Sequence, residues 1–159
     1  MTKGEAIRLF RNLNQLGNLS GVKFSYAVAR NLNTLKGEIE SIEKTLELPD
    51  KYKEFDAKRV ELAEKHAEKD KAGKPKVEAG EGGLQQFVMG ADNKKFEKEF
   101  EALKKEYKEA VALREKQIEE YTQLLVSKSE VVLHKLKLDD CPKEISAAQM
   151  AGIYEIVEE

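Results

Sequence analysis

Apolar residues recur at intervals of three and four positions along two long stretches of the chain. They are Val28, Leu32, Leu35, Ile39, Ile42 and Leu46 in the first stretch, and Phe96, Phe100, Leu103, Tyr107, Ala110 and Val111 in the second. Such spacing places one apolar stripe on each of two long helices. Because a glycine-rich segment separates them, the pattern predicts a mainly α fold, built on a long antiparallel helical hairpin. In its seam we expect Leu35, Ile39 and Ile42 to face Phe100, Leu103 and Tyr107.

Helix-terminal signals organise the rest of the chain. Thr2 and Glu5 form a capping-box pair that predicts a short N-terminal helix, and Ser146 and Gln149 form a second pair that predicts a short C-terminal helix. Pro49 either kinks the first long helix or restarts it, since proline lacks the backbone N–H that a continuous helix needs. The C-terminal helix is expected to bury its apolar face against a ribbon or against the first helix.

Two short segments carry the pattern of strands. Residues 131–138 alternate with a period of two, which places Val132, His134, Leu136 and Leu138 on one face. Segment 84–89 is its expected partner in a small two-stranded β ribbon, because an isolated strand leaves its backbone unpaired. The glycine-containing segment at about 71–83 predicts a flexible loop. All these elements belong to one predicted domain, residues 1–159.

The composition agrees with a thin core. Of the 159 residues, 40% are hydrophobic and 36% are charged, as expected where paired helices leave most positions to solvent. The 28 basic and 30 acidic side chains are finely mixed and give a net charge of -2, so nucleic acid is disfavoured as a partner. No apolar run approaches the roughly 20 residues that cross a bilayer, which argues against a membrane partner. The single cysteine, Cys141, and a start without an apolar leader predict a cytoplasmic location.

No motif predicts an enzyme or a cofactor. Gly73-Lys74-Pro75 lacks the upstream glycine and the Ser or Thr of a phosphate-binding loop. Gly80-Glu81-Gly82-Gly83 does not follow a predicted strand, as a dinucleotide-binding loop does. Acidic pairs such as Asp139-Asp140 occur all along the chain and are expected to be solvated. The sequence therefore predicts a non-enzymatic protein without a cofactor or a metal.

Both histidines have a structural explanation. His66 lies among charged residues near a predicted helix end, and no convincing second ligand follows at helical spacing, so a solvated side chain is expected rather than a metal ligand. His134 lies on the apolar face of the predicted strand, where a partly buried, hydrogen-bonded imidazole is expected. A nucleophile pair of Cys141 and His134 is the weaker alternative, because no third group or oxyanion hole accompanies it.

Two polar residues occupy the predicted seam of the second long helix. Arg114 and Gln117 fall where the apolar stripe expects hydrophobic side chains. Either the stripe shifts to Leu113 and Ile118, or the polar residues fix the register or recognise a partner. Arg114 is therefore a candidate partner-binding residue.

Several segments resemble small tailed-phage proteins of unknown function. They are Leu13-Asn14-Gln15-Leu16, the run 22–32, the run 69–75, the pattern Phe96-x-x-Glu99-Phe100-x-x-Leu103, and the run 131–138 followed by Ile145-Ser146-Ala147-Ala148. The likeness covers most of the chain as a pattern of helices and turns, without a catalytic motif. It implies a phage or prophage origin and an accessory role.

Two interaction roles follow as expectations. The first is virion structure or assembly, where a helical hairpin supplies a rigid contact surface and can form a homo-oligomer. The second is inhibition or regulation of a host or defence protein through the ribbon, whose edge can join a partner's sheet. The candidate partner-binding residues are Leu84, Phe87 and Met89 on the ribbon and Arg114 on the helix. The expected location is the cytoplasm of the bacterial host, with incorporation into the virion under the first role.

Overall fold

The computed structural model describes residues 1–80, 85–90 and 93–158, which are mainly helical. Contacts divide the chain into two compact units: the first combines Met1–Glu47 with Gln117–Glu159, and the second is Leu48–Lys116. Each unit is described by itself below. The single domain over 1–159 stays a prediction.

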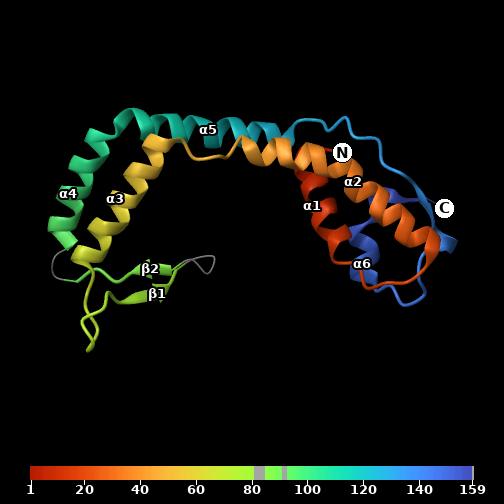
Figure 1. Ribbon diagram of the computed structural model, residues 1–159, viewed down its shortest axis with the longest axis horizontal. Coiled ribbons are helices and arrows are strands. Elements are labelled where there is room, and N and C mark those ends of the chain that lie inside the picture. The colour runs from red at the N-terminus through yellow and green to blue at the C-terminus, as the bar shows by residue number, and fades with distance from the viewer. Residues whose placement is uncertain (81–84, 91–92, 159) are drawn as a thin grey trace. The chain divides into compact units, whose positions relative to one another are not determined.

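The first unit is built on helices α1 (Lys3–Asn14), α2 (Val22–Lys44) and α6 (Ala147–Gly152). Figure 1 shows α1 and α6 next to each other on one side of α2. Both predicted capping boxes are confirmed, at Thr2 before α1 and at Ser146 before α6. The C-terminal helix packs on the first helix, where the Asn12 side-chain amide donates to the Gly152 carbonyl at 2.8 Å.

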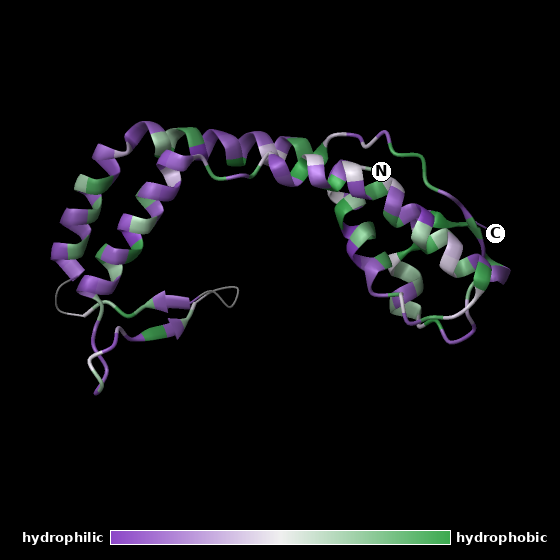
Figure 2. Ribbon diagram, viewed as in Figure 1, coloured by the Kyte–Doolittle hydropathy of each residue, from purple (hydrophilic) through white to green (hydrophobic). Residues whose placement is uncertain are grey.

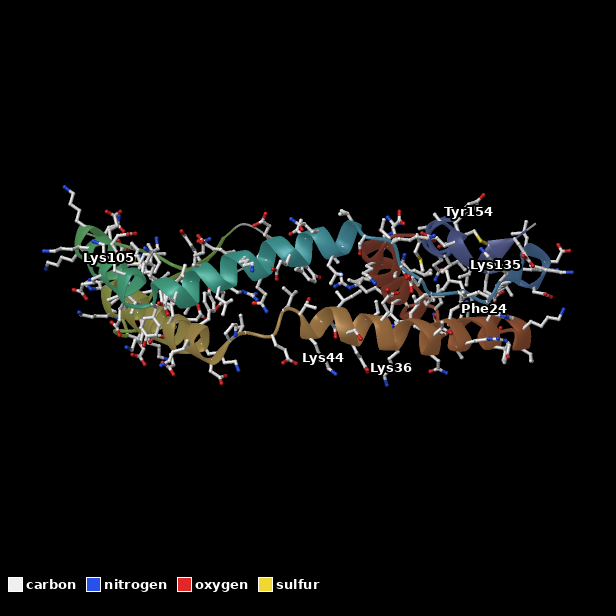
Figure 3. All side chains as sticks on the ribbon, turned by 90° about the horizontal axis from the view of Figure 1, so that it is seen from above. Phe24, Lys36, Lys44, Lys105, Lys135 and Tyr154 are labelled. Atoms are coloured by element: carbon white, nitrogen blue, oxygen red, sulfur yellow. The ribbon has the colours of Figure 1, made fainter. Side chains whose placement is uncertain are left out.

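The buried face of α2 confirms the predicted apolar stripe at Val28, Leu35, Ile39 and Ile42, whereas Leu32 is half-buried and Leu46 lies beyond the end of the helix. The buried residues of α2 are Phe24, Ala27, Val28, Asn31, Leu35, Ile39 and Ile42. One core cluster joins five of them (Phe24, Ala27, Val28, Leu35 and Ile39) to Leu9 and Leu13 of α1 and to Ile153 and Ile156 near the C-terminus, and these last four are each at most 1% exposed. Figure 3 shows Phe24 between α2 and the C-terminal segment, whereas Lys36 and Lys44 point outward from the same helix. The core therefore joins segments from both ends of the chain.

Residues 131–138 do not form the predicted strand. Only β3 (Leu136–Lys137) is a strand, and it pairs in parallel with β4 (Val157–Glu158), not with segment 84–89. Val131 and Leu133 pack against the core, while Val132 is 85% exposed, so the predicted face is also wrong there. The physical reason is that a side chain of α2, rather than a neighbouring strand, binds the backbone of this segment at His134. A two-residue period holds only where a ladder fixes the pleat. Leu138–Asp140 and Tyr154–Ile156 form short 3-10 turns.

The second unit contains α3 (Asp50–His66), α4 (Asn93–Glu106) and the start of α5 (Lys108–Val126), a helix that ends in the first unit. Pro49 caps α3 with an extended backbone, at φ -58° and ψ 143°, so the chain restarts there instead of kinking. Figure 1 shows α3 and α4 side by side. Figure 2 shows that hydrophilic residues dominate both helices, and that hydrophobic positions are scattered singly among them.

The predicted hairpin seam is not confirmed. Phe100 and Tyr107 contact the Phe55 ring of α3, with ring centroids 6.4 and 5.9 Å apart, and Leu103 is half-buried on the same helix pair. Leu35, Ile39 and Ile42 lie instead in the first unit, where Leu35 and Ile39 join its core. The restart at Pro49 explains the difference, because it turns α3 into a separate helix that packs on α4.

A small antiparallel ribbon lies beside the end of α3 (Figure 1). It pairs β1 (Val77–Ala79) with β2 (Gln85–Phe87). The predicted two-stranded ribbon therefore exists, but the partner of segment 84–89 is β1 and not residues 131–138. Ahead of it, the Asp70 carboxylate accepts the backbone N–H groups of Ala72 and Lys74 in a turn where Gly73 has φ +77°. The segment predicted as a flexible loop thus contains a hydrogen-bonded turn and a strand, and its residues 81–83 lie outside the described part of the chain.

Candidate functional site

The ribbon carries two of the four predicted partner-binding residues. Phe87 is half-buried and lies directly opposite Val77, so these two side chains share one face of the ribbon. Met89 is half-buried and bridges to Ala67, just after α3. Leu84 lies outside the described residues. The ribbon therefore presents a small apolar face beside the turn at Asp70.

The structure gives the polar residues of α5 internal partners. The Arg114 guanidinium lies 5.9 Å from the centre of the Tyr52 ring, and the Gln117 amide donates to the carbonyls of Thr45 and Glu47, at 2.5 and 3.0 Å. Leu113 and Ile118 are 54% and 47% exposed, so the stripe does not shift onto them. Gln117 thus binds the carbonyl of Thr45, the C-cap of α2, and the carbonyl of Glu47 in the segment that follows that helix. Arg114 thus has a structural contact of its own; recognition by it stays a prediction.

His66 differs from the solvated residue expected from the sequence. Its side chain is 5% exposed, its ring meets Phe96 edge-on, and its Nε2 lies 3.3 Å from Glu99 Oε2, outside hydrogen-bonding geometry within the described residues. The hydrogen bond from Lys65, and after it the close approach of the His66 ring, lower the pKa of Glu99. His66 therefore packs α3 against α4. No cluster of three or more potential metal-ligating side chains occurs among the residues that the structure describes.

Cys141 and His134 do not have the chemistry of a nucleophile pair. Burial, followed by the charge of Asp140, raises the pKa of the Cys141 thiol, which disfavours the reactive thiolate. The Cys141 Sγ lies 3.9 Å from the Lys137 carbonyl oxygen. His134 is half-buried, and its ring meets the Tyr26 ring edge-on with centroids 5.5 Å apart. These contacts fit structural roles for both side chains.

The groove that includes His134 is the strongest candidate site in the first unit. It has a volume of about 440 Å³ and lies between the start of α2 and strand β3, and we call it the α2–β3 groove. Its lining residues are Val22, Lys23, Tyr26, His134, Lys135, Leu136, Lys137, Asp140 and Glu158. A groove lined by apolar side chains together with a few charged ones is typical of sites that bind ligands or peptides.

Helix periodicity places the apolar wall of this groove. Val22 and Tyr26 are four residues apart, so both lie on one face of α2, where Val22 is 89% and Tyr26 57% exposed. Phe24 and Ala27 point into the core instead, at 1% and 0% exposure. Gly21 is the N-cap of α2, and its φ of +130° lies in a region that favours glycine.

Asn31 holds the opposite wall in place. It is completely buried, its side-chain amide donates to the His134 carbonyl, and its side-chain oxygen accepts the His134 N–H, both at 2.8 Å. One side chain thus replaces the ladder bonds that a neighbouring strand would supply. This fixes the backbone from which the His134 ring reaches Tyr26.

The charges around the groove are unevenly compensated. Lys23 forms an ion pair with Asp140 at 2.8 Å. Lys135 donates to the Glu155 backbone carbonyl at 2.7 Å, which leaves its charge without a carboxylate partner in the described chain. Lys137 likewise forms no ion pair with any residue that the structure describes. Glu158 is the remaining carboxylate that lines the groove.

Sequence reasoning missed this groove. The stripe predicted for the first long helix begins at Val28, so it assigns neither Val22 nor Tyr26 to a face. The available signal was that Val22 and Tyr26 are four residues apart and do not belong to the stripe. This spacing predicts two apolar side chains on the solvent side of an amphipathic helix. The pairing of Asn31 with His134 had no local signal, because the two residues are 103 positions apart.

Comparisons with known proteins do not add a family. No protein-family model, curated protein or solved structure matches the chain. None of the helices in its described parts is both long and apolar enough to span a membrane. The surfaces of the two units therefore carry the evidence for function.

Proposed function

We propose that the protein is a non-enzymatic phage accessory protein that acts by binding another protein, in virion structure or assembly. The observation that supports it is the α2–β3 groove, where Val22 and Tyr26 expose apolar surface on a well-packed unit. Isolated exposed apolar residues are common, but two that line one groove indicate an interaction site. Aromatic side chains at the centre of such sites often carry much of the binding energy. The phage setting rests on the sequence resemblance.

A tyrosine pair gives this proposal a matched test. Tyr26→Ala removes the exposed ring in the groove, whereas Tyr154→Ala removes a tyrosine that is 74% exposed and does not line it. Tagged protein is used to capture partners from infected cells, and light scattering gives the mass of the purified chain. We expect capsid or tail components to be recovered with the wild-type chain and Tyr154→Ala, and at least about tenfold less with Tyr26→Ala. Equal recovery with both variants would exclude the groove as the binding site.

The ribbon supports a second function, inhibition of a host or defence protein. β1 and β2 form a two-stranded sheet, so within the described residues neither outer edge pairs with a third strand. Such an edge can add to the sheet of a partner. Capture of one host protein in a fixed ratio, lost on Phe87→Asp but not on Tyr26→Ala, would favour this function over assembly.

A further inference from the structure

We propose that the α2–β3 groove binds a short acidic peptide segment of the partner protein, with one apolar side chain of that segment seated against Val22 and Tyr26. This inference rests on the proposed function, because it names the kind of partner that the groove accepts.

The size of the groove indicates a segment rather than a folded surface. Its volume of about 440 Å³ lies within the range of about 300 to 1,000 Å³ typical of pockets for small ligands. A few side chains fill such a space. Its walls are a helix and a short strand from one well-packed unit, so the groove itself loses little conformational entropy when a peptide binds.

Tyr26 is positioned to receive an apolar side chain. The edge of its ring meets His134 at an interplanar angle of 89°, and its hydroxyl accepts a hydrogen bond from Arg30 at 3.2 Å. These two contacts hold the ring while leaving the side chain exposed. Val22, one helical turn earlier, extends the same apolar surface. An aliphatic or aromatic side chain of the peptide would cover both residues.

The charge pattern selects acidic residues on either side of that apolar anchor. Lys135 and Lys137 present ammonium groups without a carboxylate partner among the described residues, and Arg30 lies one turn beyond Tyr26 on α2. Asp140 is already paired with Lys23. Acidic side chains of a peptide can therefore meet these cations, which steers association and fixes the orientation of the bound segment.

The same charges favour a peptide over nucleic acid. Asp140 and Glu158 both line the groove, and they would repel the continuous phosphate charge of a nucleic-acid strand. A peptide can place its acidic residues beside the lysines alone. Tyr26 is also the one aromatic side chain apart from His134 in the groove lining, whereas single-strand binding uses successive stacking platforms.

A selection from a random library of 12-residue displayed peptides tests the inference on the full-length chain. We expect enriched peptides to combine an excess of Asp and Glu with one large apolar residue. A synthetic copy of an enriched peptide should bind Lys137→Glu about tenfold more weakly than wild type, a difference of about 1.4 kcal/mol. Lys137→Ala should show a smaller loss of peptide affinity. It controls for a change of fold in Lys137→Glu, which places a second carboxylate opposite Glu158. Lys143→Glu makes the same charge change at an exposed lysine outside the groove and should bind like wild type.

Four results would overturn the inference. They are no enrichment, enriched peptides without acidic excess, equal loss of binding in Lys137→Glu and Lys143→Glu, and tighter binding of a 20-nucleotide oligothymidylate than of the selected peptide. The proposed function has a separate readout. If partner capture still depends on Tyr26 while the acidic preference fails, the groove binds a different protein segment; if capture is also independent of Tyr26, both proposals fail.

Discussion

The two compact units are stabilised in different ways. In the first, Leu9, Leu13, Leu35 and Ile153 are all at most 1% exposed, and they come from three separate parts of the sequence. In the second, Phe55, at 4% exposure, is the one large apolar side chain that is buried within the described residues, and α4 has none. The first unit is a packed core, while the second is a helix pair held by aromatic contacts and surface ion pairs.

The difference indicates where a binding site can be rigid and where it can adapt. Burial of apolar area is the main source of folding free energy, whereas exposed ion pairs contribute little. We therefore expect the first unit, which carries the α2–β3 groove, to be more stable than the second, which carries the ribbon. A chain of this kind should not unfold in a single two-state transition.

The largest expected effect is the loss of the second unit's aromatic centre. Phe55 contacts the rings of Tyr52, Phe100 and Tyr107. Phe55→Ala should cost about 3 to 5 kcal/mol, the usual range for a buried phenylalanine. Hydrogen exchange should show lost protection in α3 and α4 and unchanged protection in α1. Equal loss of protection in α1 would show that the two units unfold together.

Truncation of a core side chain in the first unit should lower stability by a comparable or slightly smaller amount, and the effect should be confined to that unit. Leu35 is fully buried, and Leu35→Ala should cost about 2 to 5 kcal/mol in a denaturant titration. Leu113→Ala is the control, because that side chain is 54% exposed and its loss should change stability by about 0.5 kcal/mol at most. A loss below about 1 kcal/mol for Leu35→Ala would contradict a packed core at this position.

Asn31 tests whether the first unit also depends on a buried polar contact. Asn31→Ala removes both hydrogen bonds to the His134 backbone and should cost about 1 to 3 kcal/mol. It should also release His134 from Tyr26, which would appear as a shift of the His134 ring signals in an NMR spectrum. Thr34→Ala, at an exposed position on the same helix, should leave those signals in place. Unchanged ring signals in Asn31→Ala would show that the groove wall is held by other contacts.

Local signals in the sequence predicted helix ends and faces well. The capping boxes at Thr2 and Ser146, the stripe through Leu35 and Ile39, and an interruption at Pro49 all depend on residues within one or two turns of each other. Which helices pair depends on the whole chain. The spacing of Phe96, Phe100 and Leu103 shows that α4 has an apolar face, but it fits α2 and α3 equally well as the helix that covers this face.

The remaining misses have the same physical origin. The alternation in 131–138 describes a strand only if another strand supplies a ladder, and the structure supplies the Asn31 side chain instead. His66 has a charged sequence neighbourhood, yet the ring is buried because Phe96 and Glu99 of another helix cover it. Long-range contacts therefore decided what the local pattern left open.

A half-buried carboxylate, Glu38, makes the first unit sensitive to acid. Burial alone would raise the pKa of Glu38, but hydrogen bonds from Lys3 and Ser129 outweigh it and lower the pKa below its usual value. A carboxylate with a lowered pKa in the folded state stabilises the fold above its unfolded pKa, and this contribution is lost as pH falls through the folded pKa. Glu38→Gln should cost about 1.5 kcal/mol at pH 7 and should lose less stability than wild type on acidification. An identical acid transition in the two proteins would contradict this role.

Surface ion pairs of the second unit should have the smallest effect. Lys58 lies over the Tyr107 ring and pairs with Glu106, and hydrogen bonds with Tyr107 and then Glu106 raise the pKa of Lys58. Its side chain is nevertheless 49% exposed, so water and salt screen the pair. Lys58→Met keeps the stem that packs on the ring and removes the charge, and it should shift the unfolding of α3 and α4 less than any variant above. Lys36→Met is the matched control in the first unit, where Lys36 pairs with Glu40 at 3.8 Å and is 66% exposed.

If Lys58→Met and high salt destabilised the second unit as much as Phe55→Ala does, its helices would be held by charge rather than by the aromatic cluster. The contrast with the first unit would then lie in the kind of interaction rather than in the amount of buried surface.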